Sequence, residues 1–219
     1  MSAPLSPTLT SDALERRFIA LCLRIGHAAA HLAPALYHTL EALYAHPPRA
    51  YHNLDHVAHL LDIFDAHRSH AQNADAVEFA IWLHDCVYVP GRPDNEERSA
   101  DVAVAFAKAL DCGASFTSTV QGMILATKHN GPAADSDARL VADIDISVLA
   151  LPDEAYRENS RRIRTEFAFA DDKTYSDGRR RFIADFLSRP AIFQTDPFRT
   201  AFESAARANL SAERDSLLP

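Results

Sequence analysis

Apolar residues recur every three or four positions along nearly the whole chain, and no convincing run alternates apolar and polar residues with a period of two. The spacing of three to four places apolar side chains on one face of a helix. Only six glycines occur, and short breaks of Pro, Asn, Asp or Gly separate the periodic segments. The pattern predicts an all-α protein, folded as a compact orthogonal bundle of several helices.

The breaks also indicate where individual helices begin and end. Ser11 or Asp12 is expected to cap the first helix, because both residue types accept hydrogen bonds from free helix amides. A second helix is expected to follow Pro34, and a third to begin near Asn53. The remaining predicted helices cover residues 75–88, 96–110, 115–127, 137–149, 153–169, 176–188 and 197–209.

The composition fits one ordinary domain. The 219 residues are 47% hydrophobic, which is enough to bury a substantial core. We therefore expect a single domain over residues 1–219, with residues 1–10 as a flexible N-terminus. No segment approaches about 18 uninterrupted apolar residues, and none has the pattern of a secretion signal. A membrane partner is not expected.

Charge and cysteine content narrow the expected partners and the expected cellular location. The 22 Lys and Arg against 30 Asp and Glu leave a formal net charge of -8, which disfavours a nucleic-acid partner. The cysteines are Cys22, Cys86 and Cys112, an odd and widely spaced set without a C-x-x-C pair. A reducing, cytoplasmic location is expected, and a homodimer is left open.

Eleven histidines stand out in this composition, since histidine has special roles in metal binding and proton transfer. His84 and Asp85 are adjacent after an apolar helical run, with His56 upstream. An imidazole and a carboxylate side by side can both contact a metal ion when a helix end points into a bundle. Asp143 and Asp145 follow downstream, and their directions on a helix differ by about 200°, so only one of them should face such a site.

Four segments carry a resemblance to a known family: Tyr-His-Asn-Leu-Asp-His at 51–56, Trp-Leu-His-Asp-Cys-Val-Tyr at 82–88, Ala-Thr-Lys-His at 126–129 and Val-Ala-Asp-Ile-Asp-Ile at 141–146. Together they resemble the HD superfamily, whose signature is a histidine, a His-Asp pair and a distant aspartate. The chain looks most like a group of bacterial proteins described as predicted metal-dependent HD phosphohydrolases. That likeness extends to residues 48–53, 95–100, 163–167 and 178–179.

The resemblance implies an HD-type helical bundle with one divalent metal ion, which would be Mn, Mg, Co, Fe or Zn. By position, the metal ligands would be His56, His84, Asp85 and Asp145, with Asp143 as a supporting or solvated carboxylate. The implied reaction is hydrolysis of a small phosphorylated metabolite by metal-bound water, with nucleotides as the expected class. Asp85 would then also act on the nucleophilic water as a catalytic residue.

Further site residues are expected around this set. His129 and Lys128 end a predicted helix, where they would act in catalysis, and Lys128 would also bind the substrate; a simple helix cap is the alternative for His129. An acidic protein needs local positive charge to bind a phosphate, and Arg49 and Arg164 are candidates for that role.

Three more residues are assigned to the substrate. His52 precedes His56 by four positions, but the helix is expected to begin between them, which favours a supporting role over metal ligation. Glu96 and Glu97 follow the His-Asp segment closely enough to line the site, although acidic residues are ordinary in a first helical turn.

Other functions are compatible with the same residues. Some HD-type proteins are di-iron oxygenases, and His52 and His129 would then help to hold a second ion. A non-catalytic ligand-binding HD module is a second alternative, which the complete ligand set disfavours. A nuclease is disfavoured by the acidic balance and by the absence of a basic stretch interleaved with aromatic residues.

Overall fold

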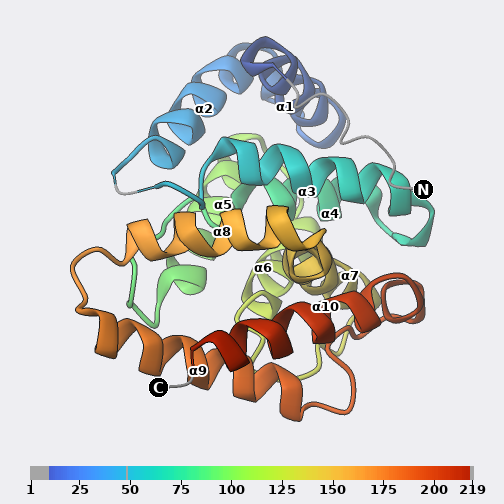
Figure 1. Ribbon diagram of the computed structural model, residues 1–219. Helices are drawn as coiled ribbons and strands as arrows, with labels where there is room; N and C mark the ends of the chain where they lie inside the picture. Colours follow the sequence, from blue (N-terminus) through green and yellow to red (C-terminus); the bar gives the residue numbers. More distant parts are fainter. Residues whose placement is uncertain (1–9, 48, 218–219) are drawn as a thin grey trace.

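The computed structural model describes residues 10–47 and 49–217, and all regular structure in those ranges is helical (Figure 1). The all-α multi-helix bundle predicted from the apolar pattern is therefore confirmed. The expected flexible N-terminus at residues 1–10 lies outside the described residues, apart from Thr10. None of the described helices combines the length and the apolar character that crossing a bilayer requires.

The described residues form ten α-helices and two short 3-10 helices. The α-helices are α1 Ser11–Ile25, α2 Ala29–Tyr44, α3 Leu54–His67, α4 Ala74–Leu83, α5 Asn95–Ala109, α6 Ala114–Ala126, α7 Ser136–Ile146, α8 Asp153–Glu166, α9 Asp172–Ser188 and α10 Asp196–Ser216. The 3-10 helices are η1 Arg68–His70 and η2 Ser147–Ala150. Figure 1 shows α1 and α2 at one end of the molecule and α9 and α10 at the other.

Helix α4 is the centre of the bundle. Its eight consecutive residues 76–83 are all buried, and it packs against α1, α3, α5, α6 and α7. Seven of these eight residues are apolar, and the eighth, Glu78, pairs with Arg17 and Arg68. A helix that is apolar on nearly every side belongs in the interior. The chain emerges from this helix at His84, so the His-Asp pair begins inside the molecule rather than on its surface.

Several helix ends differ from the prediction. The cap of α1 is Thr10, whose side chain accepts from the Ala13 amide, so the assignment to Ser11 or Asp12 was wrong. Helix α2 begins at Ala29 and contains Pro34, instead of following it. The first turns of α2 include the fully buried Ala33, so the helix extends before Pro34 although a proline cannot make one of its backbone bonds.

Helices α7 and α8 each end three residues before the predicted end, and the larger differences are at α4, α9 and α10. Helix α4 ends at Leu83, five residues before the predicted end. Helix α9 begins at Asp172, because Asp171 caps it by accepting from the Thr174 amide. Helix α10 continues to Ser216, seven residues beyond the predicted end.

Arg49 explains why the chain leaves the helix after α4. Its guanidinium donates to the backbone carbonyls of His52 at 2.9 Å, Asp85 at 2.7 Å and Cys86 at 2.9 Å. These charge-assisted bonds take up carbonyls that a longer α4 would have used internally. They also fix the His-Asp segment to the chain just before α3.

A buried carboxylate ties α7 to the start of α10. Asp143 is fully buried and accepts hydrogen bonds from the amides of Gln194 and Thr195 and from the Thr195 hydroxyl, all at 2.7 Å. Bonds to a charged group contribute more to stability than neutral ones. Asp143 is thus a structural residue of the bundle.

We predict that Asp143→Ala lowers the free energy of unfolding by about 3 kcal/mol, because it leaves two amides and a hydroxyl without their acceptor. Urea denaturation followed by circular dichroism measures the change. Asp196→Ala is the control, since Asp196 lies at the same end of α10 with its side chain 90% exposed. An equal loss in both variants would contradict the role given to Asp143.

Candidate active site

Three of the four predicted metal ligands come together in the structure. Among the described residues, the ligand atoms of His56, His84 and Asp145 all lie within 4.8 Å of one another. The Oδ1 atom of Asp145 is 3.8 Å from the Nε2 of His56 and 3.5 Å from the Nε2 of His84. Helix α3, the end of α4 and helix α7 each supply one of these side chains.

The two imidazoles of this cluster present unpaired nitrogens. In the neutral ring, the Nδ1–H of His84 donates to the Ile81 carbonyl at 2.8 Å, which leaves the lone pair on Nε2 for a cation. The Nε2 atoms of His56 and His84 are both buried and have no hydrogen-bond partner among the described residues. Buried polar atoms are nearly always paired. Two such nitrogens beside one carboxylate fit a bound cation, and the donor set suits a divalent metal.

The fourth predicted ligand, Asp85, lies beside the cluster without belonging to the group of three. Its Oδ2 is 3.3 Å from the Nε2 of His84. Burial alone would lower the pKa of His84, but the carboxylates of Asp85 and Asp145 outweigh burial and hold this pKa well above its ordinary value. The pair of carboxylates therefore favours a positive charge between them, as a metal site requires.

Asp145, and not Asp143, faces this cluster. Burial opposes ionisation of Asp145, but the hydrogen bond from His129 and the nearby imidazoles of His56 and His84 outweigh it and hold the pKa of Asp145 well below its ordinary value. The carboxylate of Asp143 is held by the segment before α10 instead. The opposite directions follow from the two-residue spacing on one helix.

His129 contacts the other oxygen of Asp145. Its Nε2–H donates to the Oδ2 of Asp145 at 2.8 Å, while its Nδ1 is buried and has no partner among the described residues. The backbone of His129 is left-handed, with a φ of 54°, and Arg189 donates to its carbonyl at 2.7 Å. Strained backbone of this kind outside glycine tends to occur at functional sites.

A buried glutamate orients His52, a pairing that the sequence analysis missed. Glu166 has a fully buried side chain and accepts from the amides of Tyr51 at 2.7 Å and His52 at 2.9 Å. It also accepts from the Nδ1–H of His52 at 2.6 Å, and the His52 ring stacks on Tyr88 at 3.9 Å between centroids. A carboxylate that holds one ring nitrogen fixes the tautomer and direction of the imidazole.

The available signal for Glu166 was its place in the segment 163–167, which resembles a family motif. Nothing in that segment connects it to His52, which lies 114 positions earlier. Only the packing of α8 beside the chain before α3 brings the two side chains together.

The predicted substrate-binding cations are engaged elsewhere. The guanidinium of Arg49 is bonded to backbone carbonyls. The ammonium of Lys128 pairs with Glu97 at 2.6 Å and lies 3.7 Å from Glu96. Arg164 donates to the carbonyls of Phe167 and Ala170 and to Asp172. Their predicted contact with a substrate gains no support from this placement.

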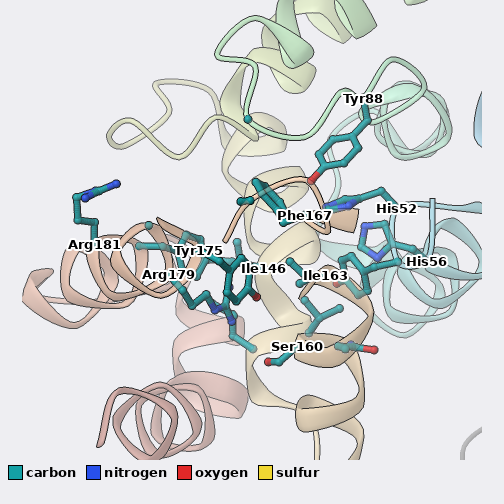
Figure 2. A pocket seen from close by; sticks show the side chains of 18 of the residues that line it. His52, His56, Tyr88, Ile146, Ser160, Ile163, Phe167, Tyr175, Arg179 and Arg181 are labelled. Carbon is teal, nitrogen blue, oxygen red and sulfur yellow. The ribbon is translucent and has the colours of Figure 1, made fainter. Parts of the chain in front are cut away.

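A cavity of about 670 Å³ opens beside the cluster, and His52, His56, His129 and Asp145 line one part of it. Figure 2 shows His52 and His56 on one side, with Tyr88 nearby. The opposite wall comes from α8, α9 and the chain between them. The cavity does not reach Arg49, Glu96, Glu97, Lys128 or Arg164.

Comparison with the profiles of known protein families, with curated proteins and with solved structures finds no match for this chain. Any function assigned to the chain therefore depends on the geometry of the site and on the sequence pattern that falls on it.

We predict that His84→Ala and Asp145→Asn each reduce bound metal from about one ion per chain to nearly none, because each removes a donor from the cluster. Asp85→Ala should weaken metal binding as well. Elemental analysis measures metal content, and circular dichroism should show retained helical content in all three variants.

Asp143→Asn is the matched control for Asp145→Asn, because the two aspartates lie on the same helix and only Asp145 faces the cluster. It should keep the bound metal despite lower stability. Unaltered metal content in His84→Ala and Asp85→Ala would contradict the site assignment.

Proposed function

We propose that the protein is a metal-dependent phosphohydrolase that acts on a small phosphorylated metabolite. The observation that carries this proposal is the pair of buried, unpaired Nε2 atoms of His56 and His84 beside the Asp145 carboxylate. These groups line or adjoin a cavity large enough for a small substrate. The His, His-Asp and Asp pattern of the HD resemblance falls on the same residues.

One divalent ion, Mn, Mg, Co, Fe or Zn, would be held by His56, His84 and Asp145, with Asp85 as the fourth donor. A bound ion of this kind lowers the pKa of water and polarises a phosphoryl oxygen. For an ion that takes six ligands, such as Mg or Mn, four protein donors would leave two positions, one for a water oxygen and one for a phosphoryl oxygen.

The side chains around the ligands have separate tasks. Glu166 keeps the proton of His52 on Nδ1, so the Nε2 of His52 can accept a proton at the cavity wall. His129 donates its Nε2–H to Asp145 and thereby holds the direction of that carboxylate. His129 is thus a positioning residue in this proposal.

A di-iron oxygenase is the second candidate, and the environment of Asp145 is the observation that favours it. One oxygen of Asp145 lies near His56 and His84, while the other contacts His129. A carboxylate with imidazoles on both oxygens is suited to lie between two ions.

Metal content and phosphate release distinguish these functions. The protein is purified without chelator or histidine tag and analysed for metals. It is then assayed for phosphate release from nucleotides, the class that the HD resemblance implies, and from other phosphate monoesters, with Mn, Co, Mg and Zn added singly. About one ion per chain with phosphate release supports the proposal. Two irons without release favour the oxygenase, and neither metal nor turnover favours a ligand-binding module.

We predict that His52→Ala lowers kcat by about 10²-fold or more, because it removes the proton acceptor at the cavity wall. Glu166→Gln should lower kcat by about tenfold, since the amide no longer fixes the His52 tautomer as a carboxylate does. Both variants should keep their metal, as elemental analysis would show. His38→Gln is the control, because the His38 side chain is 63% exposed and remote from the cavity lining. Unchanged kcat in His52→Ala would remove His52 from the mechanism.

A further inference from the structure

The cavity beside the cluster is mostly apolar. Away from the histidines its wall is made largely of aromatic and aliphatic side chains, which include Ile146, Leu149, Ile163, Phe167, Tyr175 and Phe182. Figure 2 shows Ile163 and Phe167 between the histidine side of the cavity and Tyr175 of α9. A ligand that occupies this volume would exchange water for apolar contacts over most of its surface.

Positive charge in the lining is confined to the far side. The two arginines that line the cavity, Arg179 and Arg181, lie on α9, and Figure 2 shows them away from His52 and His56. Arg179 is already paired, because it donates to both carboxylate oxygens of Glu213 at 2.7 and 2.9 Å and its side chain is 9% exposed. A chain of phosphates leading away from the cluster would meet apolar side chains instead of cations, which is unfavourable for charged groups.

Two exposed aromatic side chains also line this cavity. Within residues 10–47 and 49–217, the large apolar side chains classed as exposed are Leu23, Val89, Leu125, Phe169 and Phe182. Two of the five, Phe169 and Phe182, line the cavity, and Phe169 is 71% exposed. Exposed apolar surface that adjoins a cavity is typical of a binding site for an apolar group.

From these observations we propose that the substrate is a phosphate monoester of an apolar alcohol, alkyl or aryl. Its phosphate would lie at His56, His84 and Asp145, and its apolar body would fill the cavity toward α9. The inference rests on the proposed function and narrows it to one class of ester. It places nucleoside di- and triphosphates outside the preferred substrates.

Gly178 provides a direct test of where the apolar body lies. It lines the cavity from within α9, and a Cβ added there would meet only the guanidinium end of Arg181, at 4.0 Å. An added Cβ therefore has room at this position, and we expect a larger side chain to extend into the cavity that Gly178 lines. Replacing a helical glycine also favours the helix.

The binding of n-alkyl phosphonates with two to ten carbons to the metal-loaded protein tests the inference by calorimetry, because phosphonates are not hydrolysed. We expect affinity to rise about fourfold with each added methylene until the cavity is full. Octyl phosphonate should bind more tightly than adenosine monophosphate or adenosine triphosphate. Phosphate release from the matching alkyl phosphates is measured in parallel.

Gly178→Leu should fill part of the cavity. Binding should then stop tightening at a shorter alkyl chain length of the phosphonate than in the unaltered protein. Gly122→Leu is the matched control, since Gly122 is also a helical glycine with nothing within 4 Å of an added Cβ, on α6 and outside this cavity. Gly178→Ala is a smaller change at the same position and should shorten this limiting alkyl chain length less. The chain-length series on the unaltered protein is informative even if Gly178→Leu does not fold.

Affinity that does not change with chain length, or tighter binding of the nucleotides, would overturn the inference. Phosphate release from nucleotides in that case would leave the proposed phosphohydrolase intact. Affinity that rises with chain length without release of phosphate from alkyl phosphates would support the apolar ligand and contradict the hydrolase. If a folded Gly178→Leu variant gains affinity up to the same alkyl chain length as the unaltered protein, the apolar part of the ligand lies elsewhere. That result would overturn the inference.

Discussion

The interior of the bundle is arranged around the contacts of the Asp145 carboxylate with three imidazoles. A carboxylate with its side chain 19% exposed needs polar partners nearby: His129 donates to its Oδ2, and the Nε2 atoms of His56 and His84 lie 3.8 and 3.5 Å from its Oδ1. Two of these imidazoles belong to α3 and to the end of α4, and the third follows α6. Polar contacts to Asp145, as well as apolar packing, therefore hold these segments against α7.

Charged side chains also hold three irregular segments by binding their backbone groups. Arg49 binds the carbonyls after α4, Glu166 binds the amides before α3, and Asp143 binds the amides before α10. In each case one charged side chain satisfies several backbone groups that no helix satisfies. These bonds fix the loops near the cluster without additional regular structure.

Much of the fold and part of the site could be predicted from the sequence. The spacing of apolar residues is a local property, so it placed most of the helices well. Helix geometry also showed that only one of Asp143 and Asp145 could face a site. The ends of α4 and α10 depend on tertiary contacts, which spacing does not record. The partners of Lys128 and Glu166 lie 31 and 114 positions away, and no local pattern indicates which charges will pair.

The cluster and the wall that faces it come from different stretches of the chain. The histidines and Asp145 all precede α8, whereas the opposite wall is built by α8, α9 and the chain that joins them. Substitutions in that later stretch, at positions other than Glu166, can therefore change the ligand while the ion-binding residues stay the same. Changes in ligand specificity are therefore expected mainly from substitutions in residues 153–188, which follow the ion-binding residues in the chain.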